Sequence, residues 1–148
     1  MSSYRQLLYH FVIRTKDSKE TIDPRQAKQL YAYIAGIIKN KNSHLYRING
    51  IENHVHFLTD IHPSIAVADF IRDIKAGSSM WMKNCGYFPA FIGWSDRYAV
   101  FTCSWADIGK LAEYISTQRE HHKKEVFIDE YRRLIIDSGI AIDERYFP

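Results

Sequence analysis

Cysteine is scarce in this sequence, which has only Cys85 and Cys103 among its 148 residues. Two widely separated thiols exclude a Cys-x-x-Cys metal knuckle and a disulfide framework. No apolar run approaches the length of a membrane span, and the first five residues lack the apolar core of a signal peptide. The formal net charge is only +3, which permits contact with nucleic acid without requiring it. We therefore expect a soluble cytoplasmic protein.

Internal repeats and low-complexity linkers are also missing, and 46% of the residues are hydrophobic. We therefore expect residues 1–148 to form a single domain with a substantial core. The residue patterns predict strands at 7–15, 44–51, 54–61 and within 90–103. They predict helices that begin at 23–24, 63–64, 104–107 and 127, the last two ending near 122 and at 138. This order predicts an α+β protein with a ferredoxin-like antiparallel sheet and helices packed on it.

The tripeptide His54-Val55-His56 is the most informative short motif. Side chains two residues apart on a strand point to the same face, so both imidazoles can reach one metal ion while Val55 and Phe57 enter the core. Alone the motif is weak, because alternating polar residues are common on exposed strands.

A second pair lies in the third predicted helix, where Tyr114 and Gln118 are one helical turn apart and share a face. A tyrosine beside a buried stripe usually serves packing, so this pair is also weak by itself. The two pairs together are more specific than either one.

Together, His54-Val55-His56 and the later Tyr-x-x-x-Gln resemble the single-tyrosine transposases of the His-hydrophobic-His endonuclease superfamily, which occur in small bacterial insertion sequences and in repeat-associated relatives. The chain follows the family pattern from about Tyr4 to Tyr146. Further segments that carry the resemblance are 9–16, 75–79, 114–122 and 127–134, followed by Gly139, Asp143-Glu144 and Tyr146-Phe147. One departure is Arg97, since family members usually have glycine just before the tyrosine that is Tyr98 here.

The resemblance implies a DNA endonuclease and strand transferase in which Tyr114 attacks a phosphate of single-stranded DNA. The attack leaves a 5′-phosphotyrosine and a free 3′-hydroxyl, and rejoining reverses it. The resemblance also implies that His54, His56 and Gln118 form a neutral ligand set for Mg²⁺ or Mn²⁺. Imidazole ligands favour Mn²⁺ over Mg²⁺.

The DNA partner implied by the resemblance is single-stranded DNA that forms a hairpin at the ends of the mobile element. Lys75, on the family-like Lys-Ala-Gly-Ser-Ser segment, is the first candidate for a phosphate contact, with Arg14 and Lys16 next. The resemblance further implies a homodimer with active sites shared between chains, in which Tyr114 of one chain meets the histidine pair of the other. We assign His10, His121, His122 and Arg97 no catalytic role and expect them at a solvated or DNA-facing surface.

Three alternatives compete with an active transposase. A ferredoxin-like sheet can bind single-stranded nucleic acid without catalysis, although the strand consensus of RNA-recognition domains is missing. A rolling-circle replication initiator uses the same chemistry, although such chains are usually longer. A domesticated repeat-associated relative would keep the same active-site residues as a mobile element.

Overall fold

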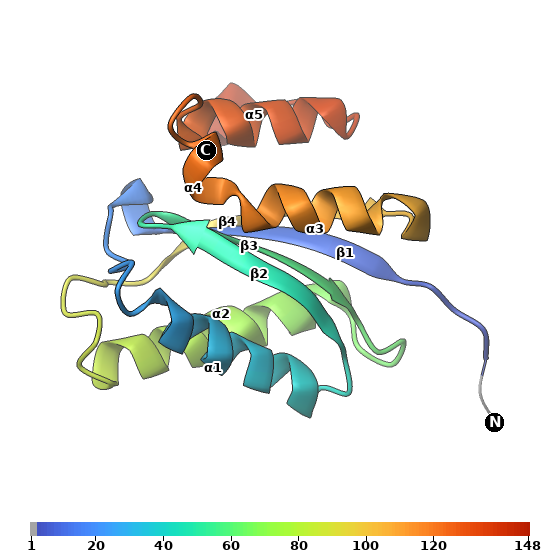
Figure 1. The fold of residues 1–148 in the computed structure, drawn as a ribbon, viewed down its shortest axis with the longest axis horizontal. Helices are drawn as coiled ribbons and strands as arrows, with labels where there is room; N and C mark the ends of the chain where they lie inside the picture. Colours follow the sequence, from blue (N-terminus) through green and yellow to red (C-terminus); the bar gives the residue numbers. More distant parts are fainter. Residues whose placement is uncertain (1–2) are drawn as a thin grey trace.

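The structure is a computed structural model that describes residues 3–148. Four antiparallel strands form one open sheet in the order β2-β3-β1-β4 (Figure 1). The strands are β1 (Leu8–Thr15), β2 (Leu45–Ile51), β3 (His54–Asp60) and β4 (Trp94–Cys103). Two long helices separate these strands in the predicted order, so the α+β class with an antiparallel sheet is confirmed.

One face of the sheet carries the main hydrophobic core. The helices α1 (Ala27–Asn40) and α2 (Val67–Asn84) lie side by side beneath this face (Figure 1). Phe11 and Phe57 from the central strands stack at a ring-centre distance of 5.0 Å and contact the helices through residues such as Phe70. Burial of these side chains removes a large apolar area from water and stabilises the sheet and helices together.

The opposite face is covered by shorter helices. These are α3 (Ile108–Ser116), α4 (Gln118–His121) and α5 (Phe127–Asp137) (Figure 1). A smaller apolar cluster joins α5 to β1 and β4 through Val12, Phe101 and Phe127. Short 3₁₀ turns occupy Lys16–Ser18, Trp105–Asp107 and Glu144–Tyr146.

The predicted strands at 44–51 and 54–61 form a hairpin of β2 and β3, with Glu52-Asn53 at its turn. Gly50 pairs with Val55, and a Cβ atom on Gly50 would stand 2.1 Å from the carbonyl oxygen of His54. Only glycine fits this close approach. The pairing of β2 with β3 shifts register between Leu45 and Arg47.

The two proline-marked helix starts were predicted too early. Asp23-Pro24 and Pro63-Ser64 form turns, and the regular helices begin at Ala27 and Val67. At the first turn the Asp23 carboxylate accepts a hydrogen bond from the backbone N–H of Arg25, 2.9 Å away. This local bond gives the chain a turn in place of a first helical turn.

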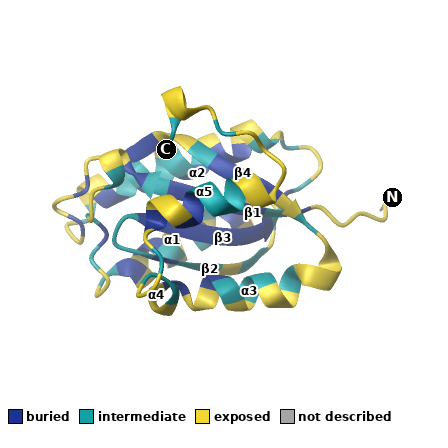
Figure 2. Ribbon diagram, turned by 90° about the horizontal axis from the view of Figure 1, so that it is seen from above, coloured by how far each residue is buried: buried dark blue, intermediate teal, exposed yellow. Residues whose placement is uncertain are grey.

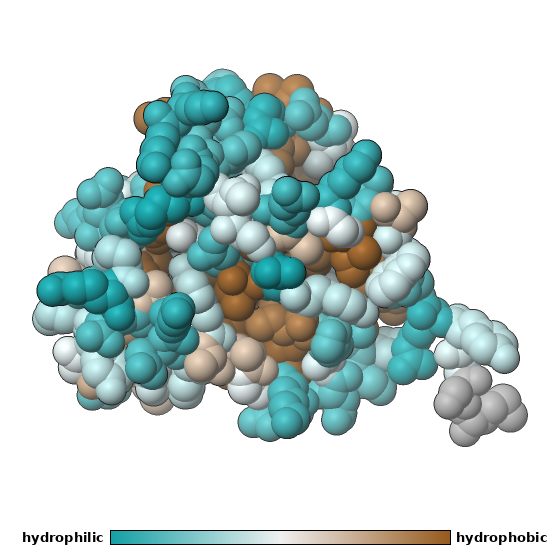
Figure 3. Space-filling model, in the orientation of Figure 1, coloured by the Kyte–Doolittle hydropathy of each residue, from teal (hydrophilic) through white to brown (hydrophobic). Residues whose placement is uncertain are grey.

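Exposure to solvent differs between the central strands and the helices that cover them. In Figure 2 the central strands β1 and β3 are mainly buried, while the outer side of α3 is exposed. The face in Figure 3 is largely hydrophilic, with apolar side chains gathered near its middle. Within residues 3–148, none of the helices is both long enough and apolar enough to cross a membrane.

Candidate functional site

The histidines of β3 point to the face that α3, α4 and α5 cover. His54 and His56 are both completely buried there. Val55 and Phe57 project to the other face and join the main core, as the strand alternation predicted. The same strand therefore serves the core with alternate residues and supplies two imidazoles to a polar cluster with the others.

His54 is held as a neutral ligand-type imidazole. Its Nδ1 lies 2.8 Å from Oδ1 of Asn53, an acceptor, so Nδ1–H donates and Nε2 keeps its lone pair. Burial lowers the pKa of His54 to about 4, so the ring is neutral at pH 7. Nε2 faces two oxygens that also carry lone pairs, Oε1 of Gln118 at 3.1 Å and Oε1 of Glu130 at 3.4 Å. A cation between these three atoms would satisfy all of them.

His56 reaches the same carboxylate from the next position on its face. Its Nε2 lies 3.1 Å from Oε1 of Glu130, and its Nδ1 lies 2.8 Å from Nε2 of His10. His10 is buried on β1, so our placement of it at a solvated surface was wrong. Burial lowers the pKa of His10 to about 3, with a further contribution from His56. This neutral partner fixes the orientation of the His56 ring.

Tyr114 and Gln118 lie on two separate helices. The single predicted helix is broken at Thr117, where α3 ends and α4 begins. The Asn49 side-chain amide donates to the carbonyl oxygens of Ile115 and Ser116, at 3.0 and 3.1 Å. These carbonyls end a helix and need partners outside it, so the contact ties the end of α3 to β2. Both predicted side chains still reach the histidine cluster.

Glu130 of α5 links the whole cluster and was missed in the sequence. Its Oε2 accepts hydrogen bonds from the Tyr114 hydroxyl and from Nε2 of Gln118, while Oε1 faces the imidazoles. Burial alone would raise the pKa of this carboxyl, but the neighbouring imidazoles of His122, His54 and His56 outweigh it and lower the pKa. A signal was present: Glu130 stands on the apolar stripe of Phe127, Tyr131 and Leu134, where a charged residue needs buried partners.

His122 also belongs to the cluster, so our expectation of a solvated surface position was wrong for it. Its Nε2 lies 3.1 Å from Oε1 of Gln118 and 3.1 Å from Oε1 of Glu130. Its side chain is 6% exposed, against 33% for that of His121. His121 packs edge-on against the ring of Tyr114, with ring centres 4.5 Å apart. The last residue of α4 and the first residue of the turn after it therefore both lie against the cluster.

The donor set suits a divalent metal ion. His54, His122 and Glu130 each offer a ligand atom, and these three atoms lie within 4.8 Å of one another. Neutral imidazoles with a carboxylate are a common ligand set for transition metals such as Mn²⁺. The neutral set expected from His54, His56 and Gln118 stays a prediction, and Glu130 would add a negative charge to it.

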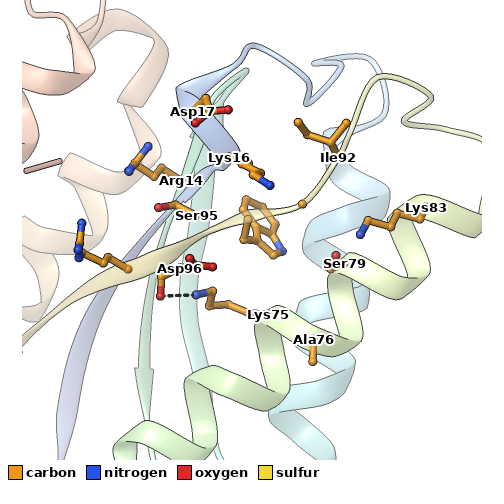
Figure 4. Close-up of a pocket in the computed structure, with 13 residues that line it drawn as sticks. Arg14, Lys16, Asp17, Lys75, Ala76, Ser79, Lys83, Ile92, Ser95 and Asp96 are labelled. Carbon is orange, nitrogen blue, oxygen red and sulfur yellow. Dashed lines mark hydrogen bonds between the residues drawn. The ribbon is translucent and has the colours of Figure 1, made fainter. Parts of the chain in front are cut away.

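The three basic residues singled out in the sequence line one hollow along the edge strand β4. Arg14, Lys16 and Lys75 surround it together with Lys83 and Arg97 (Figure 4). Lys75 Nζ donates to the carbonyl oxygen of Asp96 at 3.1 Å, as the dashed line in Figure 4 marks. Basic side chains scattered along the sequence therefore gather at one place in the fold.

Tyr114 meets the histidines of its own chain. Its ring centre lies 6.0 Å from that of His56, and α3 packs along β2. The tie from Asn49 holds α3 against its own sheet, so the cluster is assembled within one chain. The expected sharing of active sites between two chains is not tested by this arrangement. Dimerisation itself stays a prediction.

Comparison with solved structures shows the same fold in two proteins named as transposases. A proposed transposase from Deinococcus radiodurans is 24% identical, with a TM-score of 0.61 over 80% of this chain and 98% of its own. A REP-associated tyrosine transposase, solved with a REP hairpin bound, is 14% identical, with a TM-score of 0.60 over 96% of this chain and 89% of its own. No curated protein matches the sequence.

The sequence itself matches a family model. The model described as "Transposase IS200 like" covers residues 3–118, from the segment before β1 through Gln118. This span includes the histidine pair and Tyr114, and it leaves α5 and the final segment outside. The resemblance drawn from the motifs is thereby confirmed, and the chain belongs to the IS200-like transposase family.

Proposed function

We propose that this transposase cleaves and rejoins single-stranded DNA in the cytoplasm through a covalent 5′-phosphotyrosine at Tyr114, assisted by a divalent metal ion. The observation that carries the proposal is the cluster of Tyr114, two histidines of β3 and Gln118 around the carboxylate of Glu130. These side chains come from four segments of the chain, and packing alone gives no reason to bury so many polar groups together.

The metal would be held by His54, His56 and Gln118, with His122 and Glu130 as further ligands from the region that the family model does not cover. When bound, Mg²⁺ or Mn²⁺ supplies positive charge that neutralises the phosphate in the transition state. His10 orients the His56 ring and Asn53 orients the His54 ring, each through the Nδ1 atom that faces away from the cluster. These outer contacts keep both Nε2 atoms directed at the ligand position.

Tyr114 would act as the nucleophile, with Glu130 as its proton acceptor. The phenol is neutral in this arrangement, because burial and the neighbouring Glu130 carboxylate raise its pKa. Its hydroxyl already donates to Oε2 of Glu130, so the proton has a receiving atom when Oη attacks phosphorus. The other oxygen, Oε1, faces the imidazoles and remains available on the metal side.

The basic hollow along β4 would take DNA phosphates. Arg14, which lines this hollow, pairs in register with His54 across β1 and β3. Arginine and lysine side chains position the DNA backbone without reading its sequence. The structural relative that carries a REP hairpin supports hairpin-forming single-stranded DNA as the substrate.

The decisive experiment traps the covalent adduct. We expect a 3′-labelled single-stranded oligonucleotide, with an imperfect palindrome from the DNA flanking the gene, to become attached to the protein in Mn²⁺. Tyr114→Phe should bind this oligonucleotide and form no adduct on denaturing electrophoresis, because it lacks the attacking oxygen. Tyr33→Phe, on the opposite side of the sheet beside Trp81, is the matched control and should react normally. An adduct that persists in Tyr114→Phe would place the nucleophile elsewhere.

A further inference from the structure

Residues beyond Gln118 bring a second charged group to the proposed nucleophile. Arg133 lies on α5, in the part of the chain that the family model does not match. Its Nη2–H donates to Oη of Tyr114 at 3.1 Å, and its guanidinium carbon lies 5.8 Å from the centre of the tyrosine ring. Arg133 therefore touches the atom that would react with phosphorus.

A carboxylate holds Arg133 in this position. Nε and Nη2 of Arg133 donate to the two oxygens of Glu125, at 3.1 and 2.9 Å. The hydrogen bonds that Arg133 donates to Glu125 raise the pKa of Arg133, so its guanidinium keeps its charge and exchanges no proton in the reaction. Pairing through two nitrogens fixes the plane of the guanidinium, which leaves the Nη2 edge directed at Tyr114.

The charges around Oη are otherwise unfavourable to a phenolate. In the described part of the chain, Oη has hydrogen-bond contacts with Glu130 and Arg133. The Glu130 carboxylate suits a neutral phenol, because it accepts its proton and repels negative charge on the oxygen. Arg133 is the contact that favours negative charge on the same atom.

Both directions of strand transfer pass negative charge through Oη. In cleavage the bond from Oη to phosphorus forms, the bond from phosphorus to the 3′-oxygen breaks, the phenolic proton leaves Oη and the 3′-oxygen gains a proton. In rejoining the 3′-hydroxyl attacks phosphorus, loses its proton and displaces Oη, which departs with the bonding electron pair and is then protonated. A cation beside Oη lowers the barrier in each direction.

We propose that Arg133 is a catalytic residue that stabilises negative charge on the tyrosyl oxygen in cleavage and in rejoining. The proposal rests on the proposed function, since it requires Tyr114 to be the nucleophile. It assigns a chemical role to α5 that the matched family region does not contain.

Arg132 provides a matched control on the same helix. Its guanidinium pairs with Glu144 and lies 4.3 Å from the ring centre of Phe147, so it serves the final segment of the chain. Arg133→Gln should lower the single-turnover rate of adduct formation about 10- to 100-fold, the usual worth of a hydrogen bond to a charged group. Arg132→Gln should leave that rate within about twofold of wild type.

The assay uses the 3′-labelled palindrome oligonucleotide with Mn²⁺, and fluorescence anisotropy measures binding separately. Purified adduct mixed with an unlabelled 3′-hydroxyl oligonucleotide reports the rejoining rate, which should fall by a similar factor. The variant Glu125→Gln/Arg133→Gln retains a neutral hydrogen-bonded pair at the same corner, so it tests the role even if Arg133→Gln alone fails to fold.

The outcomes separate this proposal from the proposed function. Slow cleavage and rejoining with unchanged DNA binding in the Arg133 variants would support it. Wild-type rates in those variants, or an equal loss in Arg132→Gln, would overturn it while leaving Tyr114 as nucleophile. A wild-type protein that forms no adduct would overturn the proposed function and this role with it.

Discussion

The two faces of β3 differ in chemistry although both are buried. Val55 and Phe57 enter an apolar core beneath the sheet, whereas His54 and His56 enter a polar cluster above it. The first face is filled by long helices with regular apolar stripes, and the second by short helices with a break between α3 and α4. Both faces are fully buried, so burial alone does not separate structure from chemistry here. The hydrogen-bonding groups on the second face are what distinguish the site from the core.

Removing the two imidazoles of β3 should have the largest effect, which is the loss of metal binding. His54→Ala/His56→Ala is expected to abolish Mn²⁺ binding in calorimetric titration, because two of the proposed ligands disappear together. Phe57→Ala serves as the control from the other face and should retain Mn²⁺ affinity while it remains folded. Normal binding of Mn²⁺ by the double histidine variant would move the metal site away from β3.

Truncation on the apolar face should cost stability and leave the site chemistry intact. Phe57→Ala is expected to lower the free energy of unfolding by about 3–5 kcal/mol, the usual loss for a buried aromatic side chain. Phe57 is fully buried and stacked on Phe11, so the cavity cannot be filled by water without cost. Urea unfolding measures the loss. A change below about 1 kcal/mol would mean that the core rearranges to fill the space.

A fall in pH should reveal how the polar face contributes to the free energy of unfolding. We expect this to be the smallest of the three effects. The unfolded chain protonates His10 near pH 6.5, whereas the folded chain resists protonation until about pH 3. Acid therefore favours unfolding as the pH falls from 6.5, by about 1.4 kcal/mol per pH unit for this group. His10→Gln should reduce that slope in urea unfolding between pH 6.5 and 4 with EDTA present. Parallel stability curves for the two proteins would contradict the prediction.

The parts of the structure set by local pattern could be predicted from the sequence. Strand alternation identified the face that His54 and His56 share, and apolar spacing identified each long helix. The break at Thr117 could not be predicted in this way, because the spacing of Tyr114 and Gln118 suits an unbroken helix. It accompanies a distant contact, the Asn49 amide on the last carbonyls of α3.

The completion of the site depended on tertiary structure. Glu130 reaches His56 across 74 positions in the sequence, and no short motif reports such a pairing. His122 looked like part of a basic helix end, yet the turn after α4 directs it inward. The residues next to His122 in the sequence gave no information on the direction of its side chain. Only the charged residue within the apolar stripe of α5 offered an early indication.

Gly50 has no side chain, yet the position of the site depends on it. Its backbone lies so close to the His54 carbonyl that any added Cβ atom would push the start of β3 away. In a saturation mutagenesis screen for DNA cleavage, position 50 would therefore tolerate substitutions as poorly as the histidines themselves. Such a result would reflect the spacing between two strands and would not mark a residue that contacts DNA or metal.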